Sequence, residues 1–198
     1  MVPQYKLTYF NLKGLGEPLR FLLKYGNLDF EDIRYELKDW PQIKDKQPFG
    51  QLPTLEHNGK VAVQSIAIAR YLAKQVKLTG ANDWEDLEID SVIDTITDLR
   101  AKIISNHENE EAMKQVRKES IPFYLNRLET IAKNNKGHLA VGKLTWADVY
   151  FAGALDFINA RAGVNIIEKY PNLQKVVDTV LTIPQIKKWV ATRPKTDL

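Results

Sequence analysis

Hydrophobic and polar residues alternate in short runs at the beginning of the chain. Residues 5–10 and 30–36 follow this period of two, which predicts two β-strands. Between them, Glu17-Pro18 opens a run with leucines at helical spacing, and Gly26 ends it. The first part of the chain therefore predicts a strand, a helix and a second strand.

The stretch from residue 40 to residue 72 continues this pattern. Residues 40–47 predict a short helical segment, followed by a turn at 48–50. Two β-prone runs flank Asn58-Gly59, a dipeptide typical of tight hairpin turns, and a helix follows with Ser65 as its expected N-cap. The resulting β-α-β-α-β-β-α order predicts a mixed sheet in which a parallel unit joins an antiparallel hairpin.

The same stretch has features that suit a peptide-like ligand. Pro53 lacks an N–H group at the start of a predicted strand, so the neighbouring backbone is free to pair outside the sheet. The helix that begins at Ser65 offers unpaired N–H groups for a carboxylate. From this stretch alone, an ordinary hairpin followed by a capped helix is the simpler interpretation.

Beyond the polar linker at residues 79–83 the pattern changes to a helical one. A stripe with spacings of three and four, running from Ile89 to Ile103, predicts a long helix that begins near Trp84. Thr145 and Asp148 resemble a capping box at the start of a helix that runs to about Ala160. Further helices are expected at 110–134, bent near Pro122, at 173–181 and at 184–190, before an irregular tail. We therefore expect an α/β domain at residues 1–79 and an all-helical domain at residues 84–198.

Composition excludes several kinds of chemistry. The 198 residues contain no cysteine, which excludes disulfides and a thiol nucleophile from the protein itself. The three histidines, at 57, 107 and 138, do not have the spacing of metal ligands, so we expect no metal site. The sequence leaves open whether a divalent ion binds near Asp94 and Asp98. The net charge of +3 is dispersed, which argues against nucleic acid. No apolar run is long enough to span a membrane, and the N-terminus lacks the apolar region of a signal peptide, so we expect a cytoplasmic protein.

Several segments together resemble the cytosolic glutathione S-transferases, and among them the sigma class, which includes haematopoietic-type prostaglandin D synthases and arthropod enzymes. The matching segments are Tyr5-Lys6-Leu7-Thr8-Tyr9-Phe10, Asp39-Trp40-Pro41, Pro48-Phe49-Gly50, Gln64-Ser65, Ala67-Ile68-Ala69-Arg70-Tyr71-Leu72, Val92-Ile93-Asp94-Thr95, Leu144-Thr145-Trp146-Ala147-Asp148 and Arg193-Pro194. The resemblance covers the whole chain. It implies a thioredoxin-like domain followed by a helical domain, which agrees with the plan predicted from the pattern.

The resemblance also implies how glutathione is bound. Tyr9 would donate its hydroxyl hydrogen bond to the glutathione sulfur and so favour the thiolate. Leu52, followed by a cis Pro53, would pair through its backbone with the cysteinyl part of the tripeptide. The glutathione-binding set that the resemblance implies is Tyr9, Trp40, Lys44, Gly50, Gln51, Leu52, Pro53, Gln64 and Ser65, with Asp98 supplied by the partner subunit of a homodimer. Without the resemblance, Tyr9 would be read as a packed strand aromatic and Asp98 as part of a solvated helix face.

A second site, for the electrophile, is implied at Phe10, Leu15, Arg100, Ile104, Tyr150 and Leu198. Leu15 and Ser105 stand where the prostaglandin synthases have an arginine and a tryptophan, which weakens a prostaglandin-specific interpretation. Arg100 has two interpretations of equal weight: a charge beside the electrophile, or a surface arginine paired with a helix carboxylate.

The resemblance implies a glutathione transferase that conjugates the thiol to apolar electrophiles in detoxification, with lipid-peroxidation aldehydes as a hypothesis for its substrates. Glutathione would be the co-substrate, and no metal would be required. One alternative is a glutathione-dependent isomerase of prostaglandin endoperoxides. Another is a non-catalytic member of the fold that acts as a carrier of apolar ligands or as a structural protein.

Overall fold

The computed structural model describes residues 4–196 and 198, and its first part is built around a four-stranded sheet. The strands are β1 (Tyr5–Phe10), β2 (Phe30–Tyr35), β3 (Thr54–His57) and β4 (Lys60–Val63), in the order β2-β1-β3-β4. β1 is parallel to β2 and antiparallel to β3, and β3 is antiparallel to β4. This mixed sheet, a parallel unit joined to a hairpin, confirms the predicted order.

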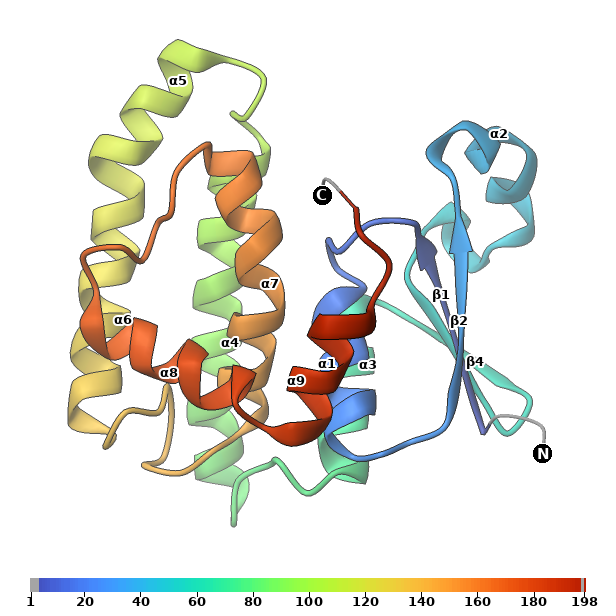
Figure 1. The fold of residues 1–198 in the computed structure, drawn as a ribbon, viewed down its shortest axis with the longest axis horizontal. Helices are drawn as coiled ribbons and strands as arrows, with labels where there is room; N and C mark the ends of the chain where they lie inside the picture. Colours follow the sequence, from blue (N-terminus) through green and yellow to red (C-terminus); the bar gives the residue numbers. More distant parts are fainter. Residues whose placement is uncertain (1–3, 197) are drawn as a thin grey trace.

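Two helices, α1 (Glu17–Tyr25) and α3 (Ser65–Gln75), lie between the sheet and the helical part of the molecule (Figure 1). Residues 37–50 form the lobe that carries α2, made of η1 (Leu37–Asp39), α2 (Trp40–Ile43), η2 (Lys44–Lys46) and η3 (Pro48–Gly50). The turn between β3 and β4 has positive φ angles at both central residues, 51° at Asn58 and 72° at Gly59. These are the angles that the Asn-Gly pair predicts.

The second part consists of α4 (Asp83–Ile104), α5 (Glu110–Gln115), η4 (Val116–Ser120), α6 (Ile121–Asn134), α7 (Trp146–Ala162), α8 (Pro171–Leu181) and α9 (Pro184–Thr192). The irregularity predicted near Pro122 is a π-helical turn at η4, directly before that proline. Proline has no N–H to donate and its ring displaces the preceding turn, so the helical ladder adjusts just before it.

Helix α7 is the centre of the molecule. Hydrophobic residues surround it on nearly all sides, and its capping box has Thr145 as the N-cap and Asp148 at the third helical position. Gly153 lets α7 approach α1 closely, because a Cβ built there would lie 2.8 Å from the Cα of Pro18. α7 packs against both α1 and α4, so it fixes the second part of the chain against the first.

Two details of the helix starts differ from the prediction. Gln64, not Ser65, is the N-cap of α3, and no side chain caps this helix by a hydrogen bond. The reason is the backbone of Gln64, whose φ of 72° turns the chain before the helix begins. α8 begins at Pro171 rather than at Leu173, because proline is accepted in the first helical turn. Within the described part of the chain, no helix is both long and apolar enough to cross a membrane.

Candidate active site

A hollow of about 370 Å³ opens where the ends of several elements of the first part meet. Its lining residues come from the end of β1, the loop before α1, the α2 lobe, the loop before β3, and the start of α3. They are Phe10, Leu15, Trp40, Gly50, Gln51, Leu52, Pro53, Val63, Gln64 and Ser65. Nine of these ten residues are ones that the sequence assigned to glutathione or to the electrophile, and Val63 is the addition. The structure thus brings most of the predicted site together around one hollow.

The backbone of this hollow offers unused hydrogen-bonding groups. Leu52 precedes a cis peptide bond to Pro53, and neither its N–H nor its C=O bonds to another residue that the structure describes. Gln64 holds an uncommon φ of 72° at the start of α3, and Gln64 and Ser65 both line the hollow, so the N-terminus of this helix lies at its edge. An extended peptide backbone and a carboxylate are the ligands that such groups accept.

Tyr9 stands beside this hollow at the end of β1, with only 6% of its surface exposed. Its hydroxyl oxygen accepts a hydrogen bond of 3.1 Å from the backbone N–H of Leu15. That bond uses a lone pair of the oxygen and leaves the hydroxyl proton available for donation. Tyr9 is therefore held in place by the loop before α1 and can donate to a ligand atom.

Two glycines of that loop are required for this arrangement. A Cβ built on Gly16 would lie 2.6 Å from the ring of Tyr9, and one built on Gly14 would lie 2.7 Å from the Tyr9 hydroxyl. Gly14 also has a φ of +40°, which disfavours other residues. In the sequence these glycines indicate only a loop, and no sequence signal ties them to Tyr9.

Burial is the largest influence on Tyr9 and raises the pKa of its hydroxyl above the ordinary value of 10.0. The N–H of Leu15 and the charges of Arg100 and Arg20 act in the opposite direction but do not cancel it. The side chain therefore stays protonated at neutral pH. A neutral phenol beside a polar hollow is a hydrogen-bond donor.

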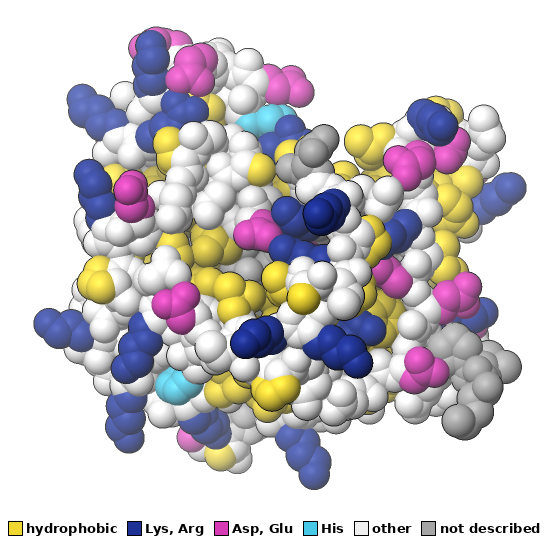
Figure 2. Space-filling model, viewed as in Figure 1, with side chains coloured by type: hydrophobic (Ala, Val, Ile, Leu, Met, Phe, Trp, Pro, Cys, Tyr) yellow, Lys and Arg dark blue, Asp and Glu magenta, His cyan; other side chains and the backbone are white. Residues whose placement is uncertain are grey.

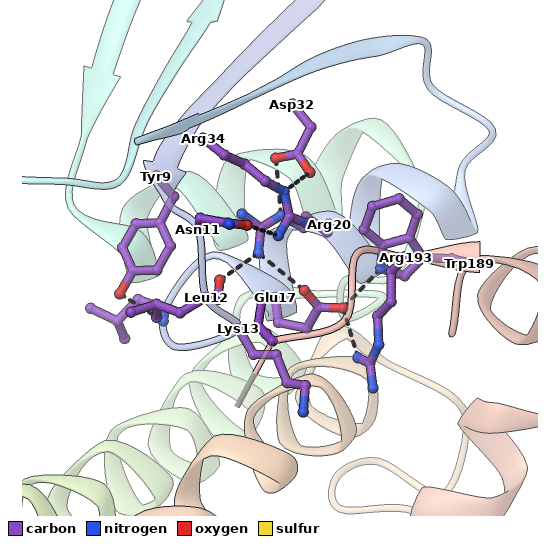
Figure 3. Close-up of polar contacts among 12 residues, drawn as sticks. Tyr9, Asn11, Leu12, Lys13, Glu17, Arg20, Asp32, Arg34, Trp189 and Arg193 are labelled. Carbon is purple, nitrogen blue, oxygen red and sulfur yellow. Dashed lines mark hydrogen bonds and ion pairs between the residues drawn. The ribbon is translucent and has the colours of Figure 1, made fainter. Parts of the chain in front are cut away.

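A buried ion-pair network supports the loop from the other side (Figure 3). Arg20, which is fully buried, bonds to Glu17 at 3.1 Å, to Asp32 at 3.0 Å and to the carbonyl of Leu12 at 3.0 Å. Glu17 in turn accepts bonds of 2.8 Å from Trp189 and from Arg193. The network joins α1 to β2, to α9 and to the loop that carries Leu15. Glu17 and Arg20 are neighbours on α1, but Trp189 and Arg193 are 172 and 176 positions from Glu17 in the chain, so no sequence pattern joins the network.

The predicted electrophile residues lie on three sides of Tyr9. Phe10 packs edge-on against Trp40, with ring centroids 5.1 Å apart. Tyr150 on α7 is buried, which raises the pKa of its hydroxyl to about 12. Arg100 on α4 is close enough for its charge to lower the pKa values of both Tyr9 and Tyr150. Among the described residues Arg100 has no carboxylate within ion-pair distance, so the structure gives no support to the interpretation as a surface ion pair.

The remaining predicted residues lie at the edges. Leu198 accepts a hydrogen bond of 2.7 Å from the N–H of Lys13, and it lines a second hollow of about 390 Å³ on the tail side of the loop. Ile104 is half-buried near the end of α4. Lys44 does not line the hollow of about 370 Å³, but it lies against Gly50, which does: a Cβ built on Gly50 would be 3.3 Å from the Cε of Lys44.

Three aspartates spaced four apart on α4 have different surroundings. Asp90 is bonded to Arg70 at 3.0 Å, whereas Asp94 and Asp98 are exposed. The single chain does not bring Asp98 to the hollow. The described residues contain no group of three or more histidine and acidic side chains of the kind that holds a metal ion.

Comparisons with known proteins agree with this arrangement. Residues 5–74 match the family model of the glutathione S-transferase N-terminal domain, and residues 93–193 match that of the glutathione S-transferase C-terminal domain. A glutathione S-transferase of Anopheles gambiae is 52% identical over the full length of both chains. Haematopoietic prostaglandin D synthase of Gallus gallus is 38% identical over 98% of this chain and 99% of its own. The solved structure of a prostaglandin synthase D of Nilaparvata lugens has a TM-score of 0.93 and 45% identity, and covers 98% of this chain and all of its own.

Proposed function

The chain belongs to the glutathione S-transferase family, and on this basis we propose that Tyr9 activates the thiol of bound glutathione for attack on apolar electrophiles. The observation that carries the proposal is the Tyr9 hydroxyl, whose oxygen is held by Leu15 while its proton remains free beside the hollow. The chain contains no cysteine, so the reacting thiol comes from glutathione.

Glutathione lies along the hollow in our proposal. Its cysteinyl backbone pairs with the free N–H and C=O groups of Leu52, as an added antiparallel strand. Its γ-glutamyl carboxylate sits at the N-terminus of α3, beside Gln64 and Ser65. The glycyl end meets Trp40 and Lys44, and Gly50 and Gln51 complete that wall.

The chemical step follows from the state of Tyr9. A free thiol with a pKa of about 8.5 is mostly protonated at neutral pH. The phenol donates a hydrogen bond that is stronger when the sulfur is anionic, and this lowers the thiol pKa. The thiolate then adds to the β-carbon of an unsaturated carbonyl compound. A carbon–sulfur bond forms, the carbon–carbon π bond becomes an enolate, and the α-carbon takes up a proton from water.

For the electrophile, we propose the side of Tyr9 that Phe10, Leu15, Arg100, Ile104, Tyr150 and Leu198 surround. Apolar side chains predominate there, which suits hydrophobic co-substrates such as lipid-peroxidation aldehydes. Membership of the sigma class, a cytoplasmic location and a role in detoxification are parts of the same proposal.

We also propose a homodimer. Several large hydrophobic side chains are exposed on η3, on β4, on α3 and on the first half of α4: Phe49, Val61, Tyr71, Trp84 and Leu87. Two copies that cover this surface by an isologous contact would give Asp98 a route to the γ-glutamyl ammonium in the partner's hollow. Light scattering at assay concentration tests this, since a mass of one chain would contradict it.

The test of the transferase is conjugation of glutathione to a reactive 2-alkenal and to an aryl halide, measured above the uncatalysed rate. We expect both products. If glutathione binds but neither product forms, the transferase proposal fails and the non-catalytic alternative, a carrier of apolar ligands, is favoured.

A second candidate is a glutathione-dependent isomerase of prostaglandin endoperoxides. It is favoured by the similarity to the prostaglandin D synthases named above. Incubation with a prostaglandin endoperoxide separates the two, because isomerisation returns glutathione unconsumed whereas conjugation consumes one molecule for each product.

A further inference from the structure

One stripe of α7 continues the site beyond Tyr150. Positions 150, 157 and 161 fall on the same side of a helix with 3.6 residues per turn. The side chain of Arg161 leans back toward the helix N-terminus, as helical side chains do, which places its guanidinium carbon 5.3 Å from the ring centre of Phe157. The stripe therefore leads from the catalytic end of the site to a cation.

A second cation meets the same ring from α4. The guanidinium carbon of Arg100 lies 5.8 Å from the ring centre of Phe157, which is 7% exposed. The charge of Arg100 also acts to lower the pKa of the hydroxyls of Tyr9 and Tyr150, so Arg100 lies near both. Phe157 thus has a guanidinium group from each of two helices, and one of them is next to the catalytic tyrosine.

Both arginines lack an anionic partner. The Nε atoms of Arg100 and Arg161 are buried and have no hydrogen-bond partner among the described residues. The arginines at 20, 34, 70, 117 and 193 each pair with a carboxylate. Both side chains are half-buried, and interaction with a ring face compensates only part of the hydration that their Nε–H groups lose. Arg100 and Arg161 are therefore cations without an ion-pair partner among the described residues, and both lie on the α4–α7 side of Tyr9.

We propose that Arg100 and Arg161 form an anion subsite at the far end of the electrophile site and select co-substrates that carry a carboxylate. The favoured class is an electrophile with an apolar chain between its reactive carbon and a terminal carboxylate. Guanidinium groups match the planar, two-oxygen geometry of a carboxylate. Both guanidinium groups lie at the ring of Phe157, seven residues and about 10 Å of helix rise beyond Tyr150, so a chain of several carbons is needed to reach from the sulfur to the subsite.

This inference rests on the proposed transferase function, and its test uses two forms of the same electrophile. The probes are a 2-alkenal with a carboxylate at the far end of its chain and the methyl ester of that compound. For each probe, kcat and KM are measured at saturating glutathione in the wild type, in R161Q and in R161K. A matched control is R127Q, because Arg127 also lies over a ring, Phe123, at 3.7 Å, but on an exposed part of α6.

We expect the wild type to prefer the acid, through a lower KM. R161Q should lower the acid-to-ester ratio of kcat/KM about tenfold, R161K should restore part of it, and R127Q should leave it as in the wild type. Equal kcat/KM for acid and ester in the wild type would overturn the subsite while the transferase stands. A similar loss of the ratio in R127Q would also overturn it, since net charge alone would then be the cause. If the wild type conjugates neither probe, the proposed function itself fails.

Discussion

Replacement of Tyr9 by phenylalanine tests the central step of the proposed mechanism. The ring would stay in its buried position, but the hydroxyl would be lost that bonds to Leu15, one of the residues lining the hollow. A hydrogen bond to a charged acceptor contributes roughly 1.5–3 kcal/mol, and one pKa unit corresponds to about 1.4 kcal/mol. The pKa of the bound thiol should therefore rise by about one to two units in Tyr9→Phe.

The assay is the ultraviolet absorbance of the thiolate, titrated against pH with glutathione saturating each protein. Below the thiol pKa of the wild type, the conjugation rate of Tyr9→Phe should be about 10-fold to 100-fold lower, in line with that shift. At high pH the two rates should converge, because glutathione is then ionised in both proteins.

Folding must be measured in parallel. Phenylalanine cannot accept the bond from Leu15, so a half-buried N–H loses its partner and the free energy of unfolding should fall by about 1 kcal/mol. Tyr150→Phe is the matched control for the thiol pKa, since it removes a neighbouring buried hydroxyl that the proposal assigns to the electrophile and not to the sulfur. If Tyr9→Phe is folded and binds glutathione with an unchanged thiol pKa, Tyr9 is only a packed aromatic and the mechanism is refuted.

Three further predictions concern other residues of the structure. Gly16→Ala should displace the ring of Tyr9 and lower kcat at least tenfold. Gly59→Ala is the control: its Cβ has open space around it, so it should cost about 1 kcal/mol of stability through its positive φ and leave kcat unchanged. Equal kcat in the two variants would contradict the steric argument. Asp148→Ala should lower the free energy of unfolding by about 2–5 kcal/mol in denaturant titration, because the buried N–H groups of Leu139 and Thr145 lose their acceptor. A loss of less than about 1 kcal/mol would contradict this, since water would then replace the carboxylate as the acceptor. The Tyr150 hydroxyl binds its proton more tightly in the folded protein, so it contributes about 3 kcal/mol to the free energy of unfolding below pH 10, and this contribution should disappear as the pH rises toward 12. In Tyr150→Phe the free energy of unfolding should therefore depend less steeply on pH over this interval than in the wild type. The same pH dependence in both proteins would refute the raised pKa of Tyr150.

The elements of this protein follow largely from local sequence. The Asn58-Gly59 pair specifies the hairpin because both residues tolerate positive φ, and the capping box at Thr145 and Asp148 specifies the start of α7. The alternation in β1 places Tyr9 on its buried face. These features need only neighbours in the chain, so the order of strands and helices could be read from the sequence.

The surroundings of the site depend on contacts between distant segments. The sequence gives no sign that Glu17 pairs with Arg193, or that Gly16 must be small to admit Tyr9, because only the tertiary structure places these residues together. The helix α3 also departs from the expected cap at Ser65, since its N-cap is Gln64 with a positive φ of 72°. Arg100 illustrates the same point: its sequence allows an ion pair on the surface, and only the packing of α4 against α7 leaves it beside Phe157 and without a carboxylate. Local propensity determined the elements, whereas packing determined which polar groups remain free to bind a ligand.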